Sequence, residues 1–300
     1  MTDPVDLGVI IVTHNSAAYV GALLDDLARV DLGLTREVVI KDNGSSDATI
    51  DIVQQYPNVT IVDDRRNVGY AAGINLASRC LGPHHALLIL NPDLRLVDGA
   101  VLAMWRRLWT YRVAAVTPRI VDEAGVLQHS LRFEPTILRS VVDSVVGAHL
   151  PTRPIWLTEG DYDPESYVYP HPVQWATGAC LMIRRDAADE VGPWDERYFL
   201  YSEEVDLMRR IRESGWQIWF EPTAVVRHAG AGSGSSPDLT ALLAVNKVRY
   251  AAAVRGPGAA SAVWFAGLTN SILRAVEPGH RRAAALLLRP WSWRFGPRVR

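Results

Sequence analysis

Cysteine is scarce in this sequence of 300 residues, which contains only Cys80 and Cys180. The two stand far apart and form no metal-ligand spacing, which argues against a structural zinc site. We expect two buried thiols in a reducing compartment rather than a disulfide.

Long apolar runs are also missing. No stretch reaches about 18 uncharged, strongly apolar residues, the length that a membrane-spanning helix needs. The nearest candidate, residues 256–273, is interrupted by glycine, proline, serine and asparagine. The first residues, MTDPVDLG, lack the basic segment of a secretory signal. The expected location is therefore cytoplasmic.

Strong net charge is absent as well. The formal net charge is −2, with 48% hydrophobic and 21% charged residues. Such a composition is typical of a folded protein with one large domain or two small ones, and it argues against a nucleic-acid partner. The balance is uneven, because residues 274–300 hold seven arginines and one acid, Glu277.

The first half of the chain alternates between apolar runs and helical patterns. This alternation predicts an α/β fold with a doubly wound, mostly parallel sheet and helices on both faces. Polar clusters, THNS, DNGSSD and NPD, follow three of the apolar runs. Ligands bind at the carboxyl ends of parallel strands, so these clusters predict a binding edge. Strands are expected at 7–12, 37–40, 59–62, 86–90 and 114–117.

The second half is less regular. We expect a hairpin at 122–132, an irregular binding loop or lid at 135–172 and a central strand at 173–183. Strands at 217–220 and 224–227 and a glycine- and serine-rich loop at 228–236 follow, and helices fill the remainder. The predicted division is a domain at 1–236 and a helical C-terminal extension at 237–300.

The segment 194–216 gathers acids among aromatic residues and a helical apolar pattern. Carboxylates in a first helical turn can simply stabilise the helix N-terminus. That account covers one or two acids, whereas a cluster is what general-base or metal chemistry needs. The five acids of its first half are Asp195, Glu196, Glu203, Glu204 and Asp206.

Three other polar sites have a structural and a functional explanation each. Asp42 could form a turn with its neighbours or accept hydrogen bonds from a nucleotide. Residues 67–75, NVGYAAGIN, could cradle a phosphate or form a tight loop packed on Gly73. Asp93 follows Pro92, which stops the preceding strand. Asp93 could bind a divalent cation with His228 as a second ligand, or both residues could have a purely structural role.

The ordered motifs together resemble glycosyltransferase family 2, and within it the bacterial rhamnosyltransferase-like members. The resemblance covers residues 7–236 and implies a GT-A fold and inverting transfer of a sugar from a nucleoside diphosphate. The motifs are VIIVTHNS, DNGSSD, NVGYAAGIN, LNPD, GACLMIRR, the segment 194–216 and the loop led by His228.

The resemblance also implies a set of nucleotide-sugar-binding residues. By position, Thr13, Asn15 and Asp42 would line the base and ribose. Asn67, Gly69 and Asn75 would lie near the diphosphate or sugar. Asp93, at the last position of the family's DxD element, would hold Mg²⁺ or Mn²⁺, and His228 would contact the metal or a phosphate.

On the acceptor side the resemblance implies Trp175 and Gly178, with Glu204 as the catalytic base. Helical spacing puts Glu203 and Asp206 on one face and rotates Glu204 away, so spacing alone does not identify the base. We assign Glu203 and Asp206 as supporting acids. This sequence departs from the family at Asn91, which replaces the first DxD carboxylate, at Lys41, and in a glycine loop with one glycine fewer.

The predicted function is inverting transfer of L-rhamnose from dTDP-rhamnose to a glycan or polyprenyl-linked acceptor in cell-wall or surface-polysaccharide synthesis. Galactofuranose, glucose and N-acetylhexosamine are alternative sugars. An inactive nucleotide- or glycan-binding homologue and a nucleotidyltransferase are alternatives of other classes. The C-terminal helices, rich in arginine and tryptophan, fit a peripheral membrane contact or a helical pair packed on the main domain or in a homodimer.

Overall fold

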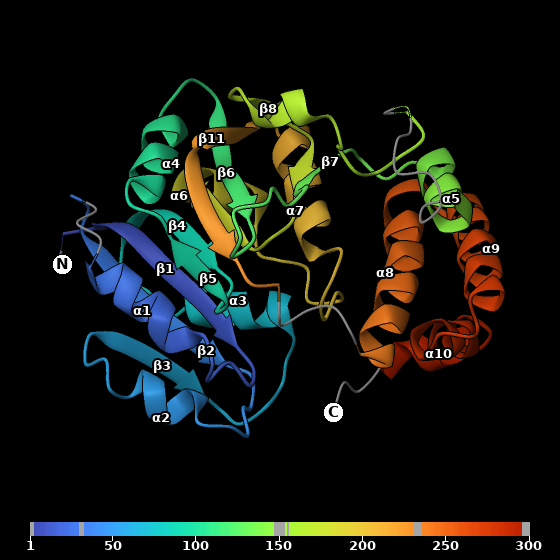
Figure 1. Ribbon diagram of the computed structural model, residues 1–300, viewed down its shortest axis with the longest axis horizontal. Helices are drawn as coiled ribbons and strands as arrows, with labels where there is room; N and C mark the ends of the chain where they lie inside the picture. Colours follow the sequence, from blue (N-terminus) through green and yellow to red (C-terminus); the bar gives the residue numbers. More distant parts are fainter. Residues whose placement is uncertain (1–2, 30–32, 147–153, 155, 231–235, 296–300) are drawn as a thin grey trace.

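A large mixed sheet forms the centre of the computed structural model (Figure 1), which describes residues 3–29, 33–146, 154, 156–230 and 236–295. In those residues the strand order is β3-β2-β1-β4-β10-β6-β11-β5, with β8 beside β11. The strands are β1 (Val5–Thr13), β2 (Arg36–Asp42), β3 (Val59–Asp63), β4 (His84–Leu90), β5 (Leu94–Leu96), β6 (Val113–Val121), β8 (His171–Val173), β10 (Cys180–Arg184) and β11 (Gln217–His228).

Helices cover both faces of this sheet because its central strands are apolar on both sides. On β1, Val9 and Ile11 pack into one core cluster, and Ile10 and Val12 into the other. The first cluster is covered by α1 (Val20–Arg29), α2 (Thr49–Val53) and α4 (Ala100–Leu108). The second is covered by α3 (Tyr70–Ser78), α6 (Arg185–Val191) and α7 (Glu203–Glu213). The predicted α/β architecture is confirmed.

The chain around residue 178 differs from its prediction. Instead of one strand at 173–183, β9 (Trp175–Ala176) pairs with β7 (Leu131–Arg132) in a separate small sheet. β10 then enters the large sheet antiparallel to both β4 and β6. The intervening residues 177–179 let the chain change sheets and bring Gly178 beside α7, where a Cβ would lie 3.6 Å from the Glu204 Cβ.

Three further expectations were wrong. The two strands predicted at 217–227 are one strand, β11, whose register shifts between Glu221 and Val225, where Pro222 has no amide hydrogen to donate. The segment 135–172 contains α5 (Ile137–Val146), η1 (Pro164–Tyr167) and β8. Cys80 follows the end of α3 and is exposed, whereas Cys180 is buried; both are free thiols.

The C-terminal helices α8 (Pro237–Arg255), α9 (Pro257–Leu273) and α10 (Pro278–Leu287) pack together, with α5 against α9 (Figure 1). They enclose a small core of their own around Val245, Val263 and Leu287. α8 also contacts the main body, because Tyr250 packs with Tyr198 and Val205. Among the residues described, none of the helices is both long enough and apolar enough to cross a membrane.

Candidate active site

Two of the predicted nucleotide-binding residues meet at the carboxyl ends of β1 and β2. The Thr13 hydroxyl donates to Asp42 Oδ1 at 2.8 Å, and both residues are buried. The Ser45 amide donates to Asp42 Oδ2 at 2.7 Å. Asn15 lies on the exposed side of this edge, and its Oδ1 accepts from the Ser46 amide at 2.8 Å. A carboxylate has about four acceptor positions, so Asp42 keeps capacity for a ligand.

Lys41, one of the departures from the family, is wholly buried in β2 beside this edge. Its ammonium group donates to Asp64 Oδ1 at 2.9 Å and to the Asp42 carbonyl oxygen. The Lys41 hydrogen bond, followed by one from Arg66, lowers the pKa of Asp64 well below its usual value. The unusual lysine is thus compensated by an ion pair within the protein.

The glycine loop before α3 is fixed by contacts that only glycine permits. Gly69 has φ +88°, and a Cβ there would lie 2.3 Å from the Phe199 carbonyl oxygen. The Asn67 side chain accepts from the Gly69 amide at 3.1 Å. This loop therefore docks on the segment before α7, so the predicted donor-side and acceptor-side elements adjoin.

Asn75, predicted near the diphosphate or sugar, lies on α3 and contacts a different segment. Its Nδ2 donates to the Trp194 carbonyl oxygen and to Glu196 Oε1, each at 2.9 Å. Its Oδ1 accepts from the Trp194 amide at 3.0 Å. These bonds anchor the start of the acidic segment, and a contact between Asn75 and the donor stays a prediction.

Asp93 and His228 converge from β4 and β11 as predicted, with Asp93 Oδ1 3.2 Å from His228 Nε2. The side chain of Gln128 sets the direction of this ring. Its Nε2 donates to the His228 carbonyl oxygen at 2.9 Å, so its Oε1, 3.1 Å from His228 Nδ1, must accept a hydrogen bond from the N–H at that nitrogen. A neutral His228 then presents the Nε2 lone pair to the Asp93 carboxylate.

Two facing acceptor atoms of this kind need a proton or a cation between them, so the pair fits a divalent ion. Within the described part of the chain, no cluster of three or more histidine, cysteine or acidic residues could hold a metal. A two-residue site suits a cation that substrate phosphates also bind. Sequence reasoning missed Gln128, because it lies 100 residues from His228 and in no motif.

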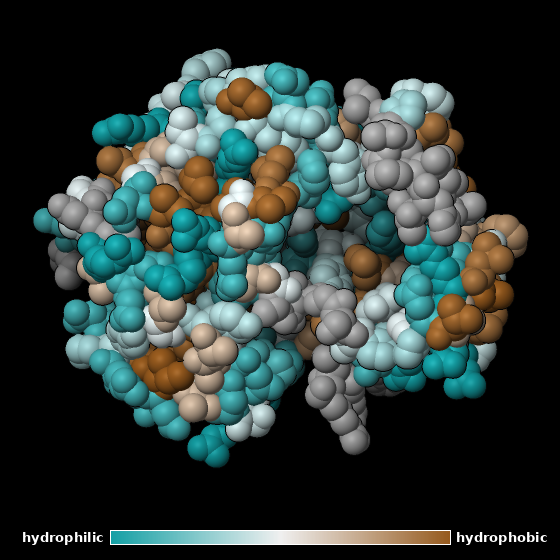
Figure 2. All heavy atoms as spheres, viewed as in Figure 1, coloured by the Kyte–Doolittle hydropathy of each residue, from teal (hydrophilic) through white to brown (hydrophobic). Residues whose placement is uncertain are grey.

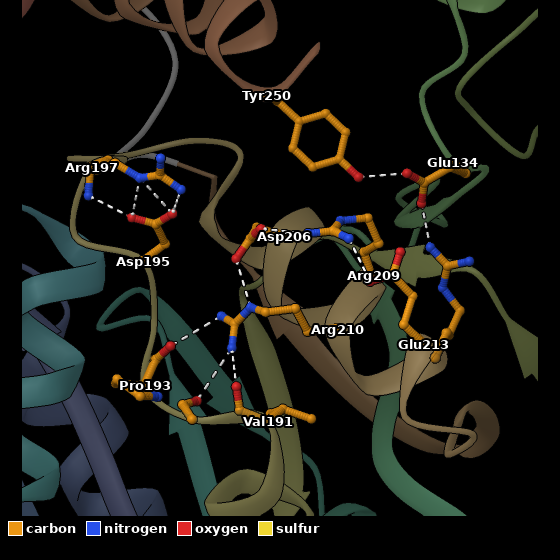
Figure 3. A network of polar contacts seen from close by, with 12 residues as sticks. Glu134, Val191, Pro193, Asp195, Arg197, Asp206, Arg209, Arg210, Glu213 and Tyr250 are labelled. Atoms are coloured by element: carbon orange, nitrogen blue, oxygen red, sulfur yellow. Dashed lines mark hydrogen bonds and ion pairs between the residues drawn. The ribbon is translucent and has the colours of Figure 1, made fainter. Parts of the chain in front are cut away.

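Four of the six acids in segment 194–216 have structural partners, and one of these is Glu213, whose Oε2 lies 2.5 Å from Arg209 Nη1. Figure 3 shows Asp195 held by Arg197, at 2.5 Å, and Asp206 held by Arg210 at 2.9 Å and Arg209 at 3.3 Å. Glu196 is bound by Asn75, as above. The Asp206 carboxylate is thus directed to arginines, although helical spacing suggested a shared face with Glu203.

Glu203 and Glu204 remain, and their carboxyl groups contact each other at the start of α7. Burial, and then the charge of Glu204, raises the pKa of Glu203 well above its usual value. Burial also raises the pKa of Glu204, against the opposing effects of its own amide, Glu203, the Gly178 amide and Arg132. A protonated Glu203 can therefore donate to an ionised Glu204, which leaves Glu204 able to accept a proton.

Trp175 and Gly178, the two residues predicted for the acceptor side, flank this pair, and a contact with the acceptor stays a prediction. Trp175 and Glu204 line one cavity of about 290 Å³, and the Trp175 Nε1 donates to the Phe133 carbonyl oxygen at 2.9 Å. Tyr70, which sequence reasoning also missed, connects the two sides of the site. Its hydroxyl group is 3.0 Å from Asn91 Oδ1 and 3.3 Å from the Gly178 carbonyl oxygen.

Comparison with known proteins finds similarity to sugar transferases. The model of the family described as "Glycosyl transferase family 2" matches residues 8–192. The N-acetylglucosaminyl-diphospho-decaprenol L-rhamnosyltransferase of Mycobacterium tuberculosis is 32% identical over an alignment of 267 positions, which covers 83% of this chain and 84% of that protein. The rhamnosyltransferase WbbL of Escherichia coli is 24% identical over 71% of this chain and 80% of its own.

Among solved structures, the mannosyltransferase PcManGT from Pyrobaculum calidifontis, in complex with GDP-Man and Mn²⁺, superimposes with a TM-score of 0.57. The alignment has 17% identity and covers 96% of this chain and 76% of that one. At this identity the match concerns the fold, and the predicted GT-A architecture is confirmed.

Proposed function

The chain belongs to glycosyltransferase family 2, and on that premise we propose that it transfers L-rhamnose, with inversion, from a nucleoside diphosphate to a polyprenyl-linked glycan acceptor in cell-wall polysaccharide synthesis. The choice of sugar and acceptor class is supported by the relative from Mycobacterium tuberculosis, whose similarity extends over most of both chains. The nucleotide is proposed to be dTDP, as in the sequence-based prediction.

The observation that carries this proposal is the position of Glu204. Its carboxyl group lines the cavity beside Trp175, and no arginine pairs with it among the described residues. In a single displacement, the acceptor hydroxyl oxygen would attack the anomeric carbon while the bond to the diphosphate breaks. Glu204 would accept the hydroxyl proton, and Glu203 would keep it oriented.

The opposite side of the site would bind the donor. Thr13, Asn15 and Asp42 are proposed to contact the nucleoside, and Asn67, Gly69 and Asn75 the diphosphate or sugar. Asp93 and His228 would hold Mg²⁺ or Mn²⁺, which when bound would neutralise charge on the departing diphosphate. The proximity of Asp93 and His228, 3.2 Å, supports this assignment.

A donor panel tests the proposal. The purified protein is incubated with Mn²⁺, a short-chain polyprenyl-diphosphate N-acetylglucosamine and dTDP-rhamnose or another nucleotide sugar, and nucleoside diphosphate release and product are measured. We expect transfer from dTDP-rhamnose to exceed transfer from UDP-galactofuranose, UDP-glucose and UDP-N-acetylglucosamine. Preferential use of another donor would contradict the rhamnose assignment, and no turnover with any donor would favour the binding homologue.

We also propose that the helical C-terminal region contacts a membrane surface. Phe265, Leu273 and Trp291 are 67%, 71% and 71% exposed, and apolar residues gather on the outer edge of α9 and α10 at the right of Figure 2. Arg281 and Arg282 are exposed on the neighbouring α10. Apolar and cationic side chains in this arrangement suit an anionic bilayer surface.

Vesicle flotation tests this contact. The double variant F265S/L273S should float less with anionic vesicles than the wild type, whereas V126S, at a 61% exposed site on another loop, should float equally. Unchanged flotation would overturn the membrane contact. Loss of a homodimer in F265S/L273S, with unchanged flotation, would assign the same face to self-association.

A further inference from the structure

The cavity beside Glu204 extends well beyond that residue, between the N-terminal ends of α5 and α7 and one face of α8. Figure 2 shows the surface hollowed between the main body and the helical group. Its volume of about 290 Å³ is at the small end of the range for ligand pockets. Thr13, Asp42 and Asp93 do not line it. A ligand here would therefore be separate from the nucleotide.

The cavity is lined by three cationic side chains, Arg132, Lys247 and Arg255, and by two acidic ones, Glu159 and Glu204. On α8, Leu243, Lys247, Ala251 and Arg255 recur every four residues, so they share the face that lines it. Arg132 lies across from them on β7. Lys247 Nζ is paired with Glu159 Oε2 at 3.1 Å. The charge of Arg132 acts on Glu159 and Glu204, and Arg255 forms no ion pair with any described residue.

The same cavity is apolar at its mouth. Ile137 at the start of α5 and Leu243 on α8 both line it and are 42% and 40% exposed. Val263 on α9 also lines the cavity and is buried. The neighbouring Leu138, outside the lining, is 50% exposed. A purely polar glycan would gain nothing from these side chains.

We propose that this cavity binds the diphosphate and the first isoprene units of a prenyl-diphosphate-linked acceptor. Arg132 and Arg255 would contact the diphosphate oxygens, with Lys247 nearby, and Ile137, Leu243 and Val263 would contact the prenyl chain. Guanidinium groups bind diphosphate oxygens through charge-assisted hydrogen bonds. The cavity is too small for a whole polyprenyl chain, which would leave between α5 and α8.

This inference rests on the proposed function, because the acceptor hydroxyl must reach Glu204. It adds that the enzyme recognises the lipid carrier itself, and not only the sugar attached to it. The cationic side chains would bind the diphosphate, and the apolar side chains at the mouth would bind the prenyl chain. Neither feature is needed for a soluble oligosaccharide acceptor.

Direct binding of farnesyl diphosphate tests the inference without any turnover. Titration calorimetry should give an affinity at least tenfold higher for farnesyl diphosphate than for farnesol or inorganic pyrophosphate. R132Q and R255Q should each weaken it about fivefold to tenfold. L243S should weaken binding of farnesyl diphosphate but not of pyrophosphate. R106Q, at an exposed arginine on α4 outside the cavity and outside the C-terminal helices, is the control and should bind as the wild type does.

The Michaelis constants provide the second readout. R255Q should raise KM for a prenyl-diphosphate-linked N-acetylglucosamine about tenfold, and leave KM for the nucleotide sugar unchanged. With an alkyl glycoside of N-acetylglucosamine, which lacks the diphosphate, R255Q and the wild type should be equal. Equal binding of farnesyl diphosphate by R132Q, R255Q and the wild type would overturn the inference, as would an equal loss in R106Q.

Failure of the proposed function would look different. In that case no nucleotide sugar would be consumed by the wild type, with either acceptor. Donor consumption with the alkyl glycoside, together with unchanged farnesyl diphosphate binding in the variants, would instead refute only the acceptor inference. Circular dichroism spectra and melting temperatures equal to those of the wild type would establish that R132Q and R255Q are folded.

Discussion

The side-chain amide of Asn246 donates to the Tyr201 carbonyl oxygen at 3.1 Å and to that of Leu200 at 2.9 Å. Asn246 is wholly buried on α8. Tyr201 and Ser202 have φ values of 71° and 77°, a left-handed conformation that costs non-glycine residues about 1–3 kcal/mol each. A C-terminal helix thus stabilises the strained turn directly before Glu203 and Glu204.

Substitution of Asn246 should therefore affect both stability and catalysis. In N246L two buried carbonyl groups lose their donor, which should lower the free energy of unfolding by about 1–3 kcal/mol. The turn would relax and kcat should fall, with donor affinity unchanged. Denaturant unfolding and steady-state kinetics measure the two effects. N270L, on α9, is the control; a normal kcat in N246L would mean that α8 does not position the acids.

The rate of transfer should fall at low pH, because Glu204 must be ionised to accept a proton. Burial raises its pKa, so the acid limb of kcat/KM should lie above the usual glutamate pKa of 4.5. E203A removes a hydrogen-bond donor to Glu204 and should move the limb to higher pH. E213A, at an exposed glutamate on the same helix, should leave it in place. A limb at 4.5 in the wild type would contradict the predicted shift.

The raised pKa of Glu203 also predicts how the free energy of unfolding depends on pH. Because the pKa of Glu203 is raised in the folded protein, its contribution is fully present below the unfolded value of 4.5 and is lost as pH rises through the folded pKa. The free energy of unfolding should decline less steeply with pH in E203Q than in the wild type over that window. Identical slopes would show that Glu203 is not protonated there.

Gln128 should control the affinity for metal through the His228 ring. Loss of such an orienting partner typically lowers metal affinity by about tenfold to a hundredfold, and we expect a loss of this size in Q128L. Electron paramagnetic resonance titration of Mn²⁺ in the presence of a nucleoside diphosphate gives the constant without turnover. Q54L, on the exposed end of α2, is the matched control. Wild-type Mn²⁺ affinity in Q128L would contradict the role given to Gln128.

Much of the fold could be predicted because it depends on local patterns. Each apolar run followed by a polar cluster became a strand whose carboxyl end lies at the site, as with Thr13 and Asp42. The change of sheet at 177–179 could not be predicted, since it depends on which strands β9 and β10 pair with. α5 was missed because its apolar face packs on the distant α9.

The site was predictable only in part for the same reason. The acidic segment was recognised as a whole, but its sequence does not reveal that Arg197, Arg209 and Arg210 neutralise Asp195 and Asp206. Those pairs form only after α7 has folded on the sheet. Gln128 and Asn246 carry no motif, and their importance comes from partners about 100 and 45 residues away.

The central claim is that Glu204, and not Asp206, takes the proton from the hydroxyl group of the acceptor. Single-turnover transfer from dTDP-rhamnose, with donor affinity measured separately by calorimetry, tests it in E204Q and D206N. E204Q should lose about 10²–10⁴-fold in rate with donor affinity nearly unchanged, whereas D206N should lose stability but retain most of its rate. Wild-type turnover in E204Q, or a loss of donor affinity in that variant, would contradict the assignment.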